Sequence, residues 1–324
     1  MQAESGPVAA GRSATFEVIW SFKVGAGPEG LQFGRVNSLL LVAAHDGVIE
    51  LWDYQEKKRV GVLTTGPRLT AVRLINDDKT LVAFHEDGRL TLWDLYHRKV
   101  ERRIGQPSSR VAGFDADAVH NVAAICMKEK PSTIHLVDLM TGSSLGSLDG
   151  QVDNPEVWFS RDGKFLYKIA GIFDEAWKSA VERWSVTAKE QMPEVIVANG
   201  AATCFAANND NSVFAVGTQD GSVYLTRANT GAQPMRLPRA NNWEVEITDV
   251  SFSRDGKWLA ACTTWFKSHL AIWSVKTGKL VMSRSPEVEN VVYTALTWSP
   301  KDDLLAVGRS KGGVEVLRIK EGKE

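Results

Sequence analysis

Few residues of this sequence have the types and spacing that catalysis or metal binding requires. The sequence has no P-loop, no H-E-x-x-H pair and no C-x-x-C pair. Residues 85–88 read HEDG and start like a zinc-protease motif, but the second histidine of that motif is missing. We therefore interpret HEDG as a hairpin turn and predict no catalytic or metal-binding residue in it.

Two carboxylates, Glu156 and Asp249, occupy matching places in two strands of a repeat that is described below. In a closed repeat, matching places can face a central channel, where a metal-dependent hydrolase would need several carboxylates, Asn or His. Two acids without a histidine or a further acid make a weak site. We favour a paired or hydrated channel lining, with a metal-dependent hydrolase as the alternative, and we expect no cofactor.

Tryptophan is abundant, with 11 residues in a chain of 324. Most tryptophans fall on positions of the repeat, but Trp177, Trp243 and Trp265 do not. An exposed tryptophan forfeits the burial of about 150–250 Å² of surface, so unassigned aromatics either pack back on the fold or bind a partner. We favour binding, and the predicted partner-binding residues are Trp177, Trp243, Trp265, Phe173, Phe266, Asn241 and Asn242.

A second group of residues is basic and is called the basic rim below. It consists of Lys57, Lys58, Arg59, Arg98, Lys99, Arg102 and Arg103, which follow the same strand in two successive repeats. Outer strands of a sheet are commonly charged, which keeps them soluble and protects the sheet edge. We favour that role, with docking of an acidic protein or a phosphate backbone as the alternative.

The strands that must position these residues repeat along the chain. Residues 46–53 read DGVIELWD, and residues 87–94 read DGRLTLWD. The tryptophan position that closes this template falls at Trp52, Trp93, Val137, Trp184, Thr226, Trp273 and Leu317, with spacings of 41, 44, 47, 42, 47 and 44 residues. A regular period of about 20–50 residues is typical of a repeat architecture.

Each repeat predicts four short antiparallel strands joined by hairpins. Residues 252–262, FSRDGKWLAAC, contain an inner strand, an Asp-Gly turn and a second strand, and the glycine supplies the positive φ of the turn. A polar turn and a fourth strand follow the tryptophan position, as in residues 274–283. Only residues 174–184 have helical as well as strand spacing, and we predict that their second half is a strand in phase with the repeat.

The two ends of the sequence predict how the repeat closes. The seventh unit stops at EGKE without room for its fourth strand, whereas residues 14–24, ATFEVIWSFKV, add a strand before the first unit. Because unpaired strand edges are costly, we expect the leading strand to pair with the last unit. The prediction is an all-β fold: a flexible leader over residues 1–13, then a single domain over residues 14–324 folded as a seven-bladed β-propeller.

The DG turns, the alternating strands that end in Trp-Asp, the period near 44 residues and the closing N-terminal strand resemble the WD-repeat family over roughly residues 14–320. The resemblance implies a propeller that presents loops to protein partners, and it implies no particular activity. Members often carry a Gly-His pair before the inner strand, but no histidine here occupies that place. Asp46, Asp87 and Asp220 are therefore predicted to be turn residues, and the tryptophans of the repeat to be buried structural residues.

In a propeller, the connections between second and third strands emerge on the same face as the connections between units. The spare tryptophans lie in connections of these two kinds, in or before the fourth and sixth units. We therefore predict a non-enzymatic interaction scaffold that binds a protein partner through this face, as a subunit of a larger complex. Recognition of a nucleic acid, a sugar or a modified peptide by the same face is the alternative.

Composition limits the partners and the compartment. The 38 basic and 39 acidic residues give a net charge of −1, so a global footprint for nucleic acid or an acidic membrane is absent. The apolar runs are strand-sized, and residues 1–14 lack the features of a secretory signal. Cys126, Cys204 and Cys262 are widely spaced and indicate free buried thiols, so we expect a cytoplasmic protein with neither a membrane nor a nucleic-acid partner.

Overall fold

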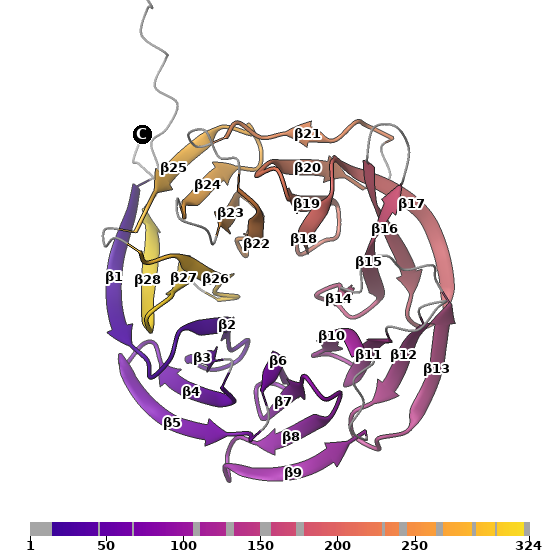
Figure 1. The fold of residues 1–324 in the computed structure, drawn as a ribbon, viewed down its shortest axis with the longest axis vertical. Helices are drawn as coiled ribbons and strands as arrows, with labels where there is room; N and C mark the ends of the chain where they lie inside the picture. The colour runs from indigo at the N-terminus through magenta and orange to yellow at the C-terminus, as the bar shows by residue number, and fades with distance from the viewer. Residues whose placement is uncertain are drawn as a thin grey trace, which may run out of the picture.

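The computed structural model describes residues 15–44, 46–66, 68–105, 111–127, 133–149, 157–172, 178–228, 231–239, 245–263, 268–286, 290–301 and 303–320. These described residues form seven four-stranded sheets and no helix. The sheets stand around a central axis as the blades of a closed ring (Figure 1). The predicted all-β fold, a seven-bladed β-propeller, is confirmed.

The blades follow one another along the chain, and the first strand of each blade lies nearest the axis (Figure 1). Blade 1 contains β2 (Pro28–Phe33), β3 (Leu39–Ala44), β4 (Val48–Asp53) and β5 (Lys58–Thr64). Blade 2 contains β6 (Leu69–Ile75), β7 (Thr80–His85), β8 (Leu90–Asp94) and β9 (Lys99–Ile104). Blade 3 contains β10 (Val111–Asp117), β11 (Val122–Met127), β12 (Thr133–Asp138) and β13 (Ser144–Asp149). Blade 4 contains β14 (Val157–Phe159), β15 (Phe165–Ile172), β16 (Lys178–Ser185) and β17 (Glu190–Asn199). Blade 5 contains β18 (Ala202–Ala207), β19 (Val213–Thr218), β20 (Val223–Arg227) and β21 (Met235–Arg236). Blade 6 contains β22 (Ile247–Phe252), β23 (Trp258–Thr263), β24 (Leu270–Ser274) and β25 (Leu280–Arg284). Blade 7 contains β26 (Tyr293–Trp298), β27 (Leu304–Arg309), β28 (Gly313–Lys320) and β1 (Thr15–Lys23).

Asp-Gly hairpin turns set the boundaries of several strands. Gly47 and Gly88 have φ angles of 88° and 83°, which a residue without a Cβ adopts at no steric cost. The preceding carboxylates of Asp46 and Asp87 each accept a hydrogen bond from the backbone two residues on, at 3.1 and 3.2 Å. These aspartates are turn residues, as predicted, and HEDG at residues 85–88 is such a turn.

Apolar side chains between neighbouring blades form the core. Leu225 of blade 5 shares one buried cluster with Trp273 of blade 6. On its other face, blade 6 places Ile272 in a cluster with Leu317 of blade 7. Each blade therefore buries both of its faces against its neighbours, which is why the stability of a single repeat depends on the repeats beside it.

The tryptophan positions of the repeat differ in burial. Trp184 and Trp273 are 2% and 1% exposed, as predicted for buried structural residues. Trp52 and Trp93 are only half-buried, and their indole N–H groups have no hydrogen-bond partner among the described residues. The expectation of burial is therefore only partly met in blades 1 and 2. This position lies at the end of the third strand, so its burial depends on what a neighbouring strand places over it, such as Phe22 over Trp52 at a centroid distance of 4.2 Å.

The leading strand closes the ring, as predicted. β1 pairs antiparallel with β28, from Thr15 opposite Lys320 to Lys23 opposite Gly313. Blade 7 therefore has the strand order β1-β28-β27-β26 and joins the two ends of the described chain in one sheet.

Polar side chains of the inner strands tie neighbouring blades together. The Asp115 carboxylate of blade 3 accepts a hydrogen bond from the backbone N of Phe159 in blade 4 at 2.8 Å. The Thr203 hydroxyl of blade 5 donates to the Ile247 carbonyl of blade 6 at 2.5 Å. Such bonds satisfy backbone groups that the ladder within a blade leaves unpaired, so they hold adjacent blades in register.

No helix capable of spanning a bilayer occurs in the described part of the chain. The one segment with helical spacing, residues 174–184, contributes its residues from Lys178 onward to strand β16, as predicted. Residues 174–177 lie outside the described residues.

Deleting residues 1–24 is expected to lower the melting temperature of the whole protein strongly. The deletion removes β1, leaves β28 as an open sheet edge and uncovers Trp52. Thermal melting followed by circular dichroism measures the effect. Deletion of residues 1–12 is the matched control and is expected to melt within about 2 °C of the full chain. If both truncations melt alike, the ring does not depend on β1.

Candidate partner-binding surfaces

The seven predicted partner-binding residues lie outside the described residues: Phe173, Trp177, Asn241, Asn242, Trp243, Trp265 and Phe266. They belong to three segments, residues 173–177, 240–244 and 264–267, which are called the partner loops below. The first segment separates β15 from β16, the second precedes β22, and the third separates β23 from β24. The described strand ends on either side therefore define where the partner loops begin and end.

The strand ends that flank the partner loops share one face of blades 4 to 6. The Ser179 hydroxyl, near the start of β16, accepts a hydrogen bond from the backbone N of Ala202 at the start of blade 5, at 3.0 Å. Thr203, beside Ala202, donates to Ile247 O at the start of blade 6. Ile247 in turn lies opposite Thr263, the last residue of β23. A continuous path of contacts thus links the ends of the three loops.

Side chains anchor these strand ends. Before residues 240–244, the Arg239 guanidinium donates to the Asp220 carboxylate at 2.8 Å. After residues 264–267, the Ser268 hydroxyl is 2% exposed and accepts a hydrogen bond from the backbone of blade 7 at 2.8 Å. The described bases of the partner loops are therefore fixed parts of the propeller.

The basic rim lies on the outer strands and outer hairpins of blades 1 and 2. All of its side chains are exposed: Lys57, Lys58, Arg59, Arg98, Lys99, Arg102 and Arg103. Arg59 pairs with Glu50 at 3.4 Å, and Lys58 lies 3.8 Å from Glu56. Lys99 and Arg103 form neither a hydrogen bond nor an ion pair through their side chains with any described residue. Glu50 is buried, whereas Lys58 and Glu56 are both exposed, and an exposed ion pair such as theirs contributes little to stability.

Three outer hairpins use a basic residue to reach the preceding blade. Lys57, Arg98 and Lys189 have φ angles of 54°, 52° and 55°, a left-handed conformation that favours glycine. The Lys57 ammonium donates to Ile19 O on the closing strand at 3.0 Å. Arg98 and Lys189 donate in the same way to backbone carbonyls on the outer strands of blades 1 and 3. Part of the basic rim therefore joins blades, a structural role that the sequence did not reveal.

Asp249 is the one predicted channel carboxylate that the structure describes, because Glu156 lies outside the described residues. Its Oδ2 accepts a hydrogen bond from the backbone N of Leu296 in blade 7 at 2.9 Å. Water reaches part of this side chain, but protein atoms surround the carboxyl group, and this burial raises its pKa to about 6. Asp249 thus ties blades 6 and 7 together. The described residues contain no group of three or more side chains suited to a metal ion.

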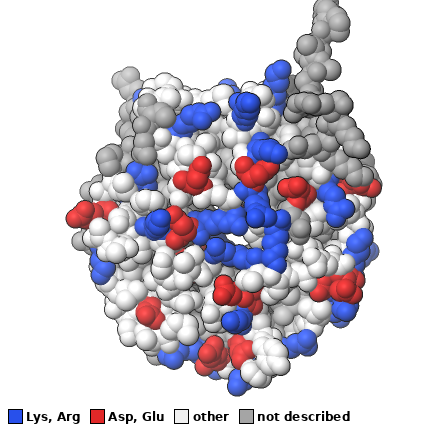
Figure 2. All heavy atoms as spheres, turned by 180° about the vertical axis from the view of Figure 1, so that it is seen from behind, with Lys and Arg blue, Asp and Glu red and all other residues white. Residues whose placement is uncertain are grey.

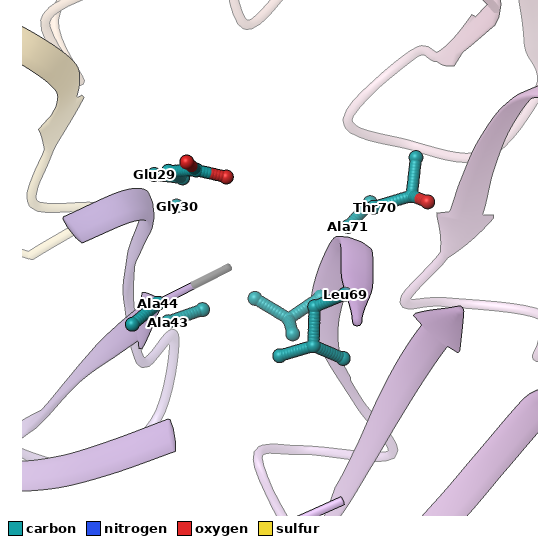
Figure 3. Close-up of a pocket in the computed structure, with 8 residues that line it drawn as sticks. Glu29, Gly30, Ala43, Ala44, Leu69, Thr70 and Ala71 are labelled. Carbon is teal, nitrogen blue, oxygen red and sulfur yellow. The ribbon is translucent and has the colours of Figure 1, made fainter. Parts of the chain in front are cut away.

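A small pocket opens between blades 1 and 2 (Figure 3). Glu29 and Gly30 line it from β2, and Leu69 and Thr70 line it from β6. Its volume of about 30 Å³ is close to the space that one water molecule occupies. The pocket is too small for an organic cofactor or substrate.

Two short runs of the sequence have the spacing of known binding or catalytic motifs, but the structure around them does not fit those motifs. Residues 25–30 read GAGPEG, the spacing of a dinucleotide-binding loop, and residues 142–146 read GSSLG, the spacing of a serine nucleophile. Both motifs need a strand followed by a helix, whereas these runs lead into the strands β2 and β13. Neither run is a candidate site.

Tyr96 is an exposed aromatic residue that sequence reasoning missed. It is 87% exposed in the outer hairpin between β8 and β9, and its ring lies edge-on to His97 at a centroid distance of 4.8 Å. Its place in a polar turn is the signal that could have found it. Outer hairpins emerge on the face opposite to the described strand ends that flank the partner loops, so Tyr96 is not near these strand ends.

Replacing Asp249 by Asn is expected to stabilise the protein at neutral pH. The folded-state pKa of about 6 lies above the ordinary value of 3.8, so the folded protein binds more protons than the unfolded chain between these values. Stability therefore falls as pH rises through this window, and above it the ionised carboxylate remains destabilising. We expect a gain of about 1–2 kcal/mol at pH 7.5 and little change near pH 4 by urea denaturation. A loss of stability at pH 7.5 would contradict this interpretation.

The basic rim is expected to bind polyanions weakly. Replacing Lys99 and Arg103 by Glu removes the two rim cations that have no partner among the described residues. We expect the variant to elute from a heparin column at the same salt concentration as the wild type. Elution at a clearly lower salt concentration would show instead that the rim binds a phosphate or sulfate backbone.

Comparison with known proteins supports the arrangement of repeats. A family model described as the anaphase-promoting complex subunit 4 WD40 domain matches residues 205–295. The small ribosomal subunit protein RACK1y of Oryza sativa subsp. japonica is 25% identical over 153 residues, which are 46% of this chain and 44% of that protein. Apoptotic protease-activating factor 1 of Rattus norvegicus is 25% identical over 173 residues, covering 48% of this chain and 14% of the relative. The U3 small nucleolar RNA-associated protein 21 homolog of Schizosaccharomyces pombe is 26% identical over 133 residues, covering 41% and 14%.

The matched segments span less than half the length of each of these curated relatives. The residues that the WD40 family model matches run from β18 of blade 5 to β26 of blade 7 in the ring of four-stranded blades. The chain is therefore similar to WD-repeat proteins, and its described residues are built as a seven-bladed β-propeller.

Proposed function

We propose that this propeller is a non-enzymatic scaffold that binds a protein partner through the partner loops. The observation that carries the proposal is the contact path from Ser179 to Thr263, which brings the described ends of all three loops to one face of blades 4 to 6. Their sequences contain three of the eleven tryptophans, together with Phe173 and Phe266. Large aromatic residues on anchored loops are the residues that most often dominate the binding energy of protein interfaces.

The described chemistry also supports a binding role over catalysis. Asp249 uses its carboxylate to hold two blades together, which is a structural role. Burial raises the pKa of the Cys126 and Cys262 thiols, which disfavours the thiolate that a cysteine nucleophile would need.

WD-repeat propellers generally act as protein-interaction scaffolds, and the names of three matches point to assemblies. One is a subunit of the anaphase-promoting complex, one is a protein of the small ribosomal subunit, and one is an RNA-associated protein. By analogy with these proteins, we propose that the present chain works as a subunit of a larger protein complex. Its described cysteines are free and buried, which supports a reducing compartment such as the cytoplasm.

Replacing Trp177, Trp243 and Trp265 together by Ala tests the partner surface. Tagged wild-type and variant proteins are used to capture partners from extracts of the native host, and the captured proteins are compared by quantitative mass spectrometry. We expect a specific set of partners to be lost from the variant. For an isolated partner, each single replacement should weaken binding by about 2 kcal/mol, measured by calorimetry.

Tyr96→Ala is the matched control, because it removes an exposed aromatic side chain from the opposite face. It is expected to keep the partners that the triple variant loses. The triple variant should melt within a few degrees of the wild type, since loop residues that await a partner contribute little to folding. Retention of all partners by the triple variant, or a large fall in its melting temperature, would refute the proposed surface.

A further inference from the structure

Several of the inner hairpins, which join the first and second strands of a blade, bring basic side chains to one end of the central channel. Lys and Arg side chains gather around the central opening on the face drawn in Figure 2. Four basic residues of these hairpins are called the channel-mouth ring: Arg35 of blade 1, Arg161 of blade 4, Arg254 of blade 6 and Lys301 of blade 7. All four are exposed to solvent.

Hydrogen bonds pass around the ring from blade to blade. The Arg161 guanidinium donates to the side-chain carbonyl of Asn209 in blade 5, and the Asn209 amide donates to Arg254 O in blade 6. Arg254 donates to Lys301 O in blade 7 at 2.8 Å, and Lys301 donates to Val36 O in blade 1. Each acceptor is a neutral carbonyl, so the relay positions the cations without neutralising them.

The hairpin of Arg35 is held by a separate contact. The backbone N–H groups of Arg35 and Val36 donate to the Asp78 carboxylate of blade 2 at 2.9 and 2.7 Å. Asp78 is 4% exposed and lies beneath the hairpin, where backbone donors occupy its oxygens. The Arg35 guanidinium itself makes no hydrogen bond or ion pair with the described residues.

Two of the three described carboxylates of the same hairpins are paired with lysines, whereas Asp303, in the hairpin of Lys301, is exposed and forms no ion pair with a described residue. Asp162 lies 3.6 Å from the Lys164 ammonium, and Asp255 lies 3.2 Å from the Lys257 ammonium. In the repeated run SRDGK, the aspartate therefore forms its ion pair with the lysine, and the arginine forms none with a described residue. None of the four ring cations forms an ion pair with a described residue.

The ring charges influence one another across the opening. Loss of hydration among the surrounding protein atoms lowers the pKa of Arg161, although its side chain is partly exposed, and the charges of Arg35 and Arg254 lower this pKa further. Arg35 belongs to blade 1 and Arg161 to blade 4, so an interaction between them means that the charges converge. Like charges held close together destabilise the empty protein, and a multivalent anion would remove that repulsion.

We propose that the channel-mouth ring binds a compact polyphosphate, such as inorganic tripolyphosphate or an inositol polyphosphate. Guanidinium groups donate paired hydrogen bonds to phosphate oxygens, and an ammonium group adds a point charge. The four cations surround one opening instead of following a stripe, so they fit several phosphates close together better than an extended nucleic-acid backbone. The ring and the described strand ends that flank the partner loops lie on opposite faces, so this site does not rest on the proposed function.

Calorimetric titration of the full chain with inositol hexakisphosphate and with tripolyphosphate tests the site. The wild type is expected to bind both, with an affinity that falls as the salt concentration rises. The double replacement Arg161→Gln and Arg254→Gln is expected to weaken binding at least tenfold. Without ligand, this variant should melt close to the wild-type temperature, because the loss of like-charge repulsion offsets the loss of two hydrogen bonds between blades. Lys301→Gln serves as a second variant at an exposed side chain and should weaken binding by a smaller factor.

The matched control replaces Lys99 and Arg103 of the basic rim by Gln, which changes the net charge by the same amount. It is expected to bind like the wild type. No binding by the wild type, or equal weakening in the ring and rim variants, would overturn the proposal, since the anion would then respond only to net charge. Tighter binding of single-stranded RNA than of inositol hexakisphosphate would also overturn it.

Vesicles that contain phosphatidylinositol bisphosphate distinguish the two sources of a clustered phosphate ligand. Sedimentation of the wild type, but not of the ring variant, with these vesicles would assign the ring to a lipid headgroup. Binding of soluble inositol hexakisphosphate without sedimentation would assign it to a free polyphosphate. Both results support the ring, whereas equal sedimentation of the wild-type protein and the ring variant would count against it.

Discussion

The pairing of β1 with β28 is the interaction on which the rest of the structure depends. A four-stranded blade has two apolar faces, and it buries both only when a blade stands on either side. An open row of blades would leave two faces and a sheet edge exposed, whereas the closed ring leaves none of the seven without neighbours. The closing strand also reaches beyond its own blade, since Phe22 covers Trp52 and Ile19 accepts a hydrogen bond from Lys57 of blade 1.

Closure divides the molecule into two faces with different chemistry. Connections between second and third strands, and between blades, emerge on one face, and their described ends are joined by hydrogen bonds across blades 4 to 6. The inner and outer hairpins emerge on the other face, where short turns carry basic residues toward neighbouring blades. The proposed partner surface and the proposed polyphosphate site therefore use separate sets of turns on one scaffold.

The two groups of basic residues show why net charge says little about a propeller. The chain as a whole is nearly neutral. On the basic rim, Arg59 is paired with a carboxylate of its own blade, and Lys57 and Arg98 donate hydrogen bonds to carbonyls of the preceding blade. These cations therefore stabilise the fold. At the channel mouth, the aspartate of each SRDGK run forms an ion pair with the lysine of the run and not with the arginine. The same residue types thus have different environments because the ring gathers one group and spreads out the other.

The sequence by itself determined the number of blades, the hairpin turns and the closing strand. These features depend on local signals, namely alternation along a strand, Asp-Gly turns with positive φ, and a period near 44 residues. It also singled out the partner-loop residues, whose role stays a prediction because they lie outside the described residues. Only the tertiary structure decided that Trp273 is buried while Trp52 is half-buried, that Asp249 bonds to the next blade, and that Arg161 meets charges from two other blades. Each of these outcomes is set by contacts between blades, whose residues are far apart in the chain, and a repeat pattern cannot specify what a distant repeat places beside a given side chain.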